Sequence, residues 1–143
     1  MQVDELRVGE FLAALGARTP APASGAAAAL TGAFAAALVE LAARFANDEA
    51  AVTRAKALSS RLTKLAQEDT AAYAAFMESR SEEARNRTIE VPNEIAACAD
   101  EVELLARKVR AQLTSSVAGD AEAAEELARA AARVARRLAE LNA

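Results

Sequence analysis

Asp69 is the residue of this sequence whose surroundings most clearly suggest chemistry. Residues 49–81 read as one long helix, because apolar positions recur there at alternating spacings of three and four. The stripe consists of Ala55, Leu58, Leu62, Leu65, Asp69, Ala72 and Phe76. An ionised carboxylate in an apolar seam is costly, and if it is unpaired its pKa rises into a range useful for proton transfer. Asp69 is therefore either a candidate acid/base or a carboxylate that lies at the edge of the seam or pairs with Arg or Lys.

Other side chains that could move protons or bind a metal ion are few. Tyr73 follows Asp69 by four residues and shares its helix face, so it is either a catalytic hydroxyl or a hydrogen-bonded core tyrosine. The chain has no histidine, which excludes Ser-His-Asp and Cys-His catalysis and removes the commonest zinc ligand. Cys98 falls in an apolar seam and is expected to behave as a small hydrophobic residue. We expect no metal site.

The junction "RTPAPASGAAAALTGA", residues 18–33, stops one helix and starts another. Ser24 is a natural N-cap, and Gly25 allows another group to approach closely. Because backbone N–H groups at a helix start attract anions, the same junction could bind a phosphate or a carboxylate. By spacing alone, capping is the favoured interpretation.

Two further groups of charged residues have simpler interpretations. Asp120 is expected to cap the last helix or to lie in its first turn, where a negative charge favours the helix dipole. The arginines at 85, 87, 136 and 137 are expected to be solvated surface charges.

These residues would be positioned by helices alone, because no segment reads as a strand. We expect a short helix over 3–15 and long helices over 25–46 and 49–81. A polar stretch, SEEARNRT, should then break the chain, with Pro92 in the first turn of a fourth helix. The fifth helix should start at Asp120. Short connections make neighbours antiparallel, so the prediction is an all-α, antiparallel bundle of four long helices plus a short N-terminal helix, as a single domain over 1–143.

The apolar stripes predict which faces are buried. The second helix is apolar nearly all round, so it should be the central one, with a seam at Leu30, Phe34, Leu38, Leu41 and Phe45. The fourth helix has a seam at Val91, Ile95, Cys98, Val102, Leu105 and Val109. The fifth carries Leu127, Ala131, Val134, Leu138 and Leu141 on one side.

Composition limits the classes of partner. The 143 residues include 42 alanines, and the formal net charge is -4, so the basic excess of a nucleic-acid binder is missing. The apolar segment 25–41 is mostly alanine and contains Glu40, which argues against a membrane span. A single cysteine and an N-terminus without a hydrophobic signal region suit the cytoplasm.

The junction and the helix after it resemble the cyclodeaminase domain of the formiminotransferase-cyclodeaminase family. That family carries a proline, three glycines and a serine before an alanine-rich helix, and here Pro22-Ala23-Ser24-Gly25-Ala26 stands in the same place. Weaker similarities follow in order along the chain. They lie at residues 11–22, 68–77, 91–105 and 116–131.

The resemblance implies an all-helical homodimer with a cleft that binds a folate. The implied reaction is ring closure of 5-formiminotetrahydrofolate to 5,10-methenyltetrahydrofolate with loss of ammonia, or the related cyclohydrolase reaction. It assigns Asp69 and Asp120 to the catalytic site. It assigns substrate binding to Pro22, Ala23, Ser24, Gly25 and Ala26. We expect Tyr73, which shares the helix face of Asp69, to bind substrate as well. The folate is substrate or ligand, and no separate cofactor is implied.

The sequence also supports an alternative. Ala23 and Ser24 replace two of the family's glycines, Ala26 replaces its serine, and residues 79–90 lack the lysine-bearing stretch that the family usually has. These differences favour a non-catalytic helical homodimer of the same fold that binds another ligand or partner.

Overall fold

The computed structural model describes residues 2–143, which form helices and contain no strand. A short 3₁₀ helix, η1, spans Val3–Glu5 and is followed by α1, Val8–Gly16. The four long helices are α2, Ser24–Phe45; α3, Glu49–Ser79; α4, Glu82–Arg110; and α5, Ala118–Asn142. The all-α prediction is therefore confirmed.

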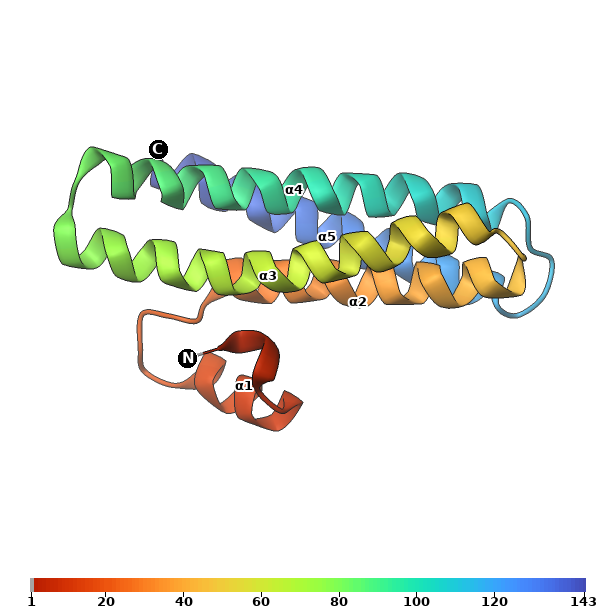
Figure 1. The fold of residues 1–143 in the computed structure, drawn as a ribbon, viewed down its shortest axis with the longest axis horizontal. Coiled ribbons are helices and arrows are strands. Elements are labelled where there is room, and N and C mark those ends of the chain that lie inside the picture. The colour runs from red at the N-terminus through yellow and green to blue at the C-terminus, as the bar shows by residue number, and fades with distance from the viewer. Residues whose placement is uncertain (1) are drawn as a thin grey trace.

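The four long helices form an antiparallel bundle in which α2 contacts α3 and α5, and α4 contacts α3 and α5 (Figure 1). The diagonal pair α2 and α4 also touches. The short α1 stands away from the bundle, below α2 in the view of Figure 1. The N-terminus of α2, the C-terminal half of α3, the start of α4 and the end of α5 meet at one end of the bundle.

Large side chains from α3 and α4 fill the core, as their stripes predict. Leu58, Leu62 and Leu65 of α3 are buried, and so are Ile95 and Val102 of α4. Cys98 is half-buried in that seam, and burial raises the pKa of its thiol, as expected of an inert cysteine.

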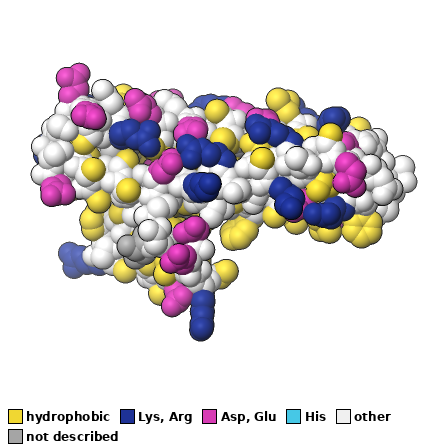
Figure 2. Space-filling model, in the orientation of Figure 1, with side chains coloured by type: hydrophobic (Ala, Val, Ile, Leu, Met, Phe, Trp, Pro, Cys, Tyr) yellow, Lys and Arg dark blue, Asp and Glu magenta, His cyan; other side chains and the backbone are white. Residues whose placement is uncertain are grey.

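The predicted seams of α2 and α5 are wrong in part. Both helices bury mainly alanine, while Phe34, Leu41 and Phe45 of α2 are 59%, 40% and 62% exposed. On α5, Leu127, Val134 and Leu141 also face outward. The reason is steric: alanine faces let helices approach closely, so these helices pack through their small side chains and leave the large ones outside. Figure 2 shows hydrophobic side chains along the lower edge of the bundle, where α2 runs.

The start of α4 also differs from the prediction. SEEARNRT does not break the helix: Arg80 ends α3 in the left-handed conformation, and the hydroxyl of Ser81 caps α4 by accepting a hydrogen bond from the N–H of Ala84 at 3.1 Å. Pro92 therefore lies inside α4, ten residues after its start, and not in its first turn. At the start of α3, the carboxylate of Asp48 caps the helix by accepting a hydrogen bond from the N–H of Ala51 at 3.1 Å.

By length and composition alone, α2 is apolar enough to cross a membrane. The core helix of a bundle has the same property, and 56% of its most apolar window is buried against the other helices.

Candidate functional site

A small cavity lies at the end of the bundle where α2 begins. Its volume is about 150 Å³. The loop before α2 and the ends of α3, α4 and α5 enclose it, and its lining residues are Pro20, Ala21, Ala23, Ser24, Gly25, Asp69, Tyr73, Thr88, Leu138 and Asn142.

Asp69 is the titratable group of this cavity with a perturbed pKa. Burial raises the pKa of its carboxyl from 3.8 to about 6. Within residues 2–143 no Lys or Arg forms an ion pair with it, so the interpretation as a paired carboxylate is wrong. The continuous apolar stripe of α3 directs Asp69 inward, and the raised pKa follows from that position.

Gly25 lets the Asp69 carboxyl lie directly against the first turn of α2. A Cβ added at Gly25 would overlap the Asp69 carboxylate, so the close approach predicted for this glycine is confirmed. The other replaced positions of the loop need no glycine, because Ala23 and Ser24 both avoid positive φ.

The first turn of α2 presents backbone donors to the same place. The first helical hydrogen bond runs from the N–H of Ala27 to the carbonyl of Ala23 at 3.1 Å, so the N–H groups of Ser24, Gly25 and Ala26 precede the helical ladder. Ala23 is the N-cap, and the Ser24 side chain does not cap the helix, so the assignment of Ser24 as N-cap is wrong. Its exposed hydroxyl lines the cavity instead.

Pro92 explains how Asn142 comes to line the cavity. Because proline has no N–H, the carbonyl of Thr88, four residues earlier, lacks its helical donor. The side-chain Nδ2 of Asn142 donates to that carbonyl at 2.9 Å. This bond fixes the end of α5 beside the start of α4, next to Asp69 and Tyr73.

The structure brings together most of the predicted site residues. Ala23, Ser24, Gly25, Asp69 and Tyr73 line one cavity. Tyr73 is half-buried, and no hydrogen bond between it and Asp69 occurs in the described part of the chain. The neighbouring Pro22 and Ala26 are buried and support the loop and helix start without lining the cavity.

Asp120 is not part of this cavity. It lies in the first turn of α5, whose last residue, Asn142, lines the cavity. The two are 22 positions apart in one helix, which corresponds to about 33 Å. Within one chain, Asp69 and Asp120 therefore do not share a site.

Sequence patterns missed Thr88, Leu138 and Asn142. The usable signal was Pro92, since a proline inside a helix frees the carbonyl four residues earlier and requires another donor nearby. Pro92 was expected in the first turn of its helix, where a missing N–H leaves no carbonyl without its donor, so the need for another donor was overlooked.

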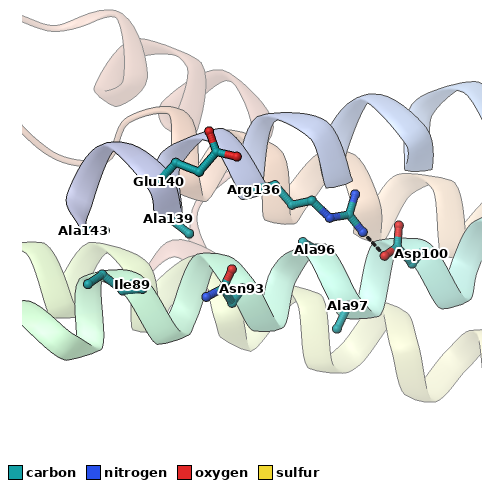
Figure 3. Close-up of a pocket in the computed structure, with 9 residues that line it drawn as sticks. All are labelled: Ile89, Asn93, Ala96, Ala97, Asp100, Arg136, Ala139, Glu140 and Ala143. Atoms are coloured by element: carbon teal, nitrogen blue, oxygen red, sulfur yellow. Dashed lines mark hydrogen bonds and ion pairs between the residues drawn. The ribbon is translucent and has the colours of Figure 1, made fainter.

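A larger hollow between α4 and α5 offers no unpaired, buried carboxyl like that of Asp69. It is an open groove of about 470 Å³ whose floor includes Ala96, Ala97 and Ala139 (Figure 3). Of its three charged lining residues, Asp100 and Arg136 pair with each other across the groove, and the third is Glu140. Across residues 2–143, no cluster of three His, Cys, Asp or Glu side chains is placed to hold a metal ion.

The site thus defines a class: a helical bundle with one protonatable carboxyl beside the free N–H groups of a helix start. Such a pair can transfer a proton near neutral pH and hold an electron-rich group of a ligand. The family model of formiminotransferase-cyclodeaminase matches residues 7–143. The chain belongs to the formiminotransferase-cyclodeaminase family.

A solved structure supports the same fold. The crystal structure of formiminotetrahydrofolate cyclodeaminase from Thermotoga maritima superposes with a TM-score of 0.93 at 24% identity, over 98% of this chain and 79% of that one. At this identity the likeness concerns the fold. No curated protein matches the chain significantly.

Proposed function

We propose that the chain binds a tetrahydrofolate derivative at the α2 cavity and catalyses ring closure of 5-formiminotetrahydrofolate to 5,10-methenyltetrahydrofolate, or the related cyclohydrolase reaction. The observation that carries the proposal is Asp69, an unpaired carboxyl with a pKa raised to about 6, placed beside the α2 N-terminus. Family membership and the similar fold of a formiminotetrahydrofolate cyclodeaminase support it.

Ring closure needs a proton to move between two nitrogens. N10 attacks the carbon of the protonated formimino group, N5–CH=NH2+, and forms the new C–N bond. N10 then loses its proton, the former imino nitrogen, now –NH2, gains one, and its C–N bond breaks to release NH3 and leave the methenyl cation. A carboxyl whose pKa lies near working pH can accept the first proton and donate the second. Asp69 is the candidate for this relay.

The cavity limits which part of a folate it can receive. Its volume of about 150 Å³ is below the roughly 300–1,000 Å³ usual for a complete ligand pocket. The reacting end of the folate would therefore enter the cavity, while the remainder lies across the surface. The N–H groups of Ser24 and Gly25, in the first turn of α2, would hold an electron-rich atom of that end.

The proposal is tested by following methenyltetrahydrofolate absorbance with 5-formiminotetrahydrofolate and, separately, hydrolysis of the methenyl compound. We expect Asp69→Asn to reduce the rate at least about 100-fold, the lower end of typical general acid–base contributions. Gly25→Ala should also lower the rate because its methyl group displaces the Asp69 carboxyl. Asp100→Asn, in the open α4–α5 groove, is the matched control and should keep wild-type activity.

The alternative function is a non-catalytic homodimer of the same fold that binds another ligand. Ala23 and Ser24 favour it, since their side chains line the cavity where the family has glycines. The catalytic proposal fails if the wild-type chain forms no methenyltetrahydrofolate and binds no tetrahydrofolate analogue at millimolar concentration. Activity lost on Asp69→Asn would instead reject the alternative.

We also propose that the chain works in the cytoplasm as a homodimer, without nucleic acid or membrane as a partner. The net charge of -4 and the single cysteine support this setting.

A further inference from the structure

Asn142, the last residue of α5, holds a side-chain amide at the α2 cavity in a fixed orientation. Its Nδ2 donates to the backbone carbonyl of Thr88 at 2.9 Å, the carbonyl that Pro92 leaves without a helical donor. Because a carbonyl oxygen can only accept, the nitrogen of the Asn142 amide must face Thr88, and not its Oδ1. The bond therefore decides which end of the amide is left for another partner.

Two more hydrogen bonds close a ring around this amide. The hydroxyl of Thr88, which is 6% exposed, donates to the carbonyl of Arg85 at 2.6 Å, and Nε of Arg85 donates to the backbone carbonyl of Asn142 at 3.3 Å. The end of α5 is thus tied to the first turns of α4, beside which it lies in Figure 1. Within residues 2–143, no group donates to Oδ1 of Asn142. The acceptor of a restrained amide is therefore free for a ligand.

The lining side chains contributed by α3, α4 and α5 determine what this part of the cavity can bind. Asp69 contributes an unpaired carboxyl and Asn142 an amide oxygen, and in a cavity of about 150 Å³ one small group can contact both. Thr88 donates its hydroxyl hydrogen to the backbone, and Tyr73 can donate or accept. No lysine or arginine lines the cavity. These side chains are therefore complementary to a group that brings N–H donors or a positive charge.

This complementarity separates two groups of the same shape. The formimino group of the proposed substrate, –CH=NH2+ when protonated, carries N–H donors and a positive charge, whereas a formyl group, –CH=O, carries only an acceptor. A site that hydrogen-bonds an N–H rejects the analogue that lacks it, because the acceptor of the site is then left without a partner. A formyl oxygen would also bring two acceptors together at Oδ1 of Asn142.

We propose that Asn142 is a specificity-determining residue of the α2 cavity, whose Oδ1 accepts a hydrogen bond from the formimino N–H of the substrate and so selects formimino over formyl folates. Asn142 moves no proton; it holds the nitrogen that leaves. This inference rests on the folate site proposed above and adds the residue that recognises the leaving nitrogen.

Equilibrium binding of two folates tests the proposal in an Asp69→Asn chain, whose turnover should be slow enough for the measurement. Isothermal titration should give a dissociation constant for 5-formiminotetrahydrofolate at least about tenfold below that for 5-formyltetrahydrofolate. Asn142→Ala should remove most of this preference by weakening formimino binding, while formyl binding stays nearly unchanged. Gln112→Ala, which removes an amide at the opposite end of the bundle, should keep the preference. A preference that survives Asn142→Ala overturns the proposal.

A Pro92→Ala background separates recognition of the substrate from support of the helix end. There the N–H of residue 92 can bond to the Thr88 carbonyl, so that carbonyl no longer depends on Asn142. Asn142→Ala should still remove the formimino preference in this background. If the preference is lost only in the chain that contains Pro92, Asn142 acts through its bond to Thr88, and the proposal is wrong.

The rate assays separate this inference from the catalytic proposal. Turnover by the wild-type chain, combined with a preference that Asn142→Ala does not change, rejects this inference alone. A chain that shows the preference but forms no methenyltetrahydrofolate supports the recognition by Asn142 and rejects catalysis alone. A chain that binds neither folate rejects both.

Discussion

At the scale of single residues, the cavity depends on Asp69 and Gly25. Gly25 has no Cβ, so a carboxyl on the neighbouring helix lies against the first turn of α2. Burial then raises the pKa of that carboxyl to about 6. The other family glycines are replaced by Ala23 and Ser24, neither of which has a positive φ. Of the three glycine positions, the one retained is therefore the one that the geometry of Asp69 requires.

The raised pKa predicts how Asp69 affects stability with pH. The folded-state pKa of about 6 lies above the ordinary aspartate pKa of 3.8, so ionising Asp69 costs more in the folded chain than in the unfolded one. This cost is absent below about pH 4, grows between pH 4 and 6, and is complete above about pH 6. Asp69→Asn should therefore raise the free energy of unfolding at about pH 8, by up to roughly 3 kcal/mol, and by much less at about pH 4.

Urea unfolding of Asp69→Asn and wild type at both pH values checks this expectation. Asp100→Asn provides the control, since its carboxylate is exposed and paired with Arg136. A stability difference that does not change between the two pH values would contradict the raised pKa.

At the scale of helices, the sequence predicted the elements better than their orientation. The seams of α3 and α4 were predictable because each has large apolar residues on one face and polar residues on the other. On α2 both faces are apolar, and hydrophobic periodicity does not tell an inward alanine face from an outward face of Phe34 and Phe45. The Asp69 site was predictable from a single polar residue in a stripe, whereas Asn142 was not, because a contact between α4 and α5 places it there.

The contact between α4 and α5 gives a prediction for Pro92. Asn142→Ala should lower the free energy of unfolding by about 1 kcal/mol, because the Thr88 carbonyl loses the donor that replaces the missing N–H of Pro92. In a Pro92→Ala background the N–H of residue 92 can bond to that carbonyl, so Asn142→Ala should then cost clearly less.

A double-mutant cycle measured by urea unfolding gives the coupling between the two positions. Equal costs of Asn142→Ala in the two backgrounds would show that Asn142 does not compensate for Pro92. Gln112→Ala serves as a control for loss of an exposed side-chain amide, and its cost should be the same with proline or alanine at position 92.

At the scale of the whole molecule, two helices of the bundle, α2 and α5, bury small side chains and expose large apolar ones, the reverse of the usual arrangement. Alanine fills the contacts of α2 and α5, and phenylalanine and leucine are left on the surface of α2. Folding of one chain thus leaves apolar area exposed, and burial of such area is the dominant force in association. We therefore expect the proposed homodimer to contribute part of the stability of this fold.

If association contributes to stability in addition to the folding of each chain, the melting temperature should depend on protein concentration. Because a dimer that unfolds to two chains is stabilised by mass action, raising the concentration about 100-fold should raise the melting temperature of the wild-type chain by several degrees. Leu41→Glu, which places a charge on the exposed apolar surface of α2 between Phe34 and Phe45, should melt at a lower temperature that no longer changes with concentration. Scanning calorimetry across that range measures both proteins, with Leu104→Glu as the variant that should keep the concentration dependence. A wild-type melting temperature that stays constant while light scattering reports a dimer would mean that association contributes nothing to folding, and that the chain folds fully before it pairs.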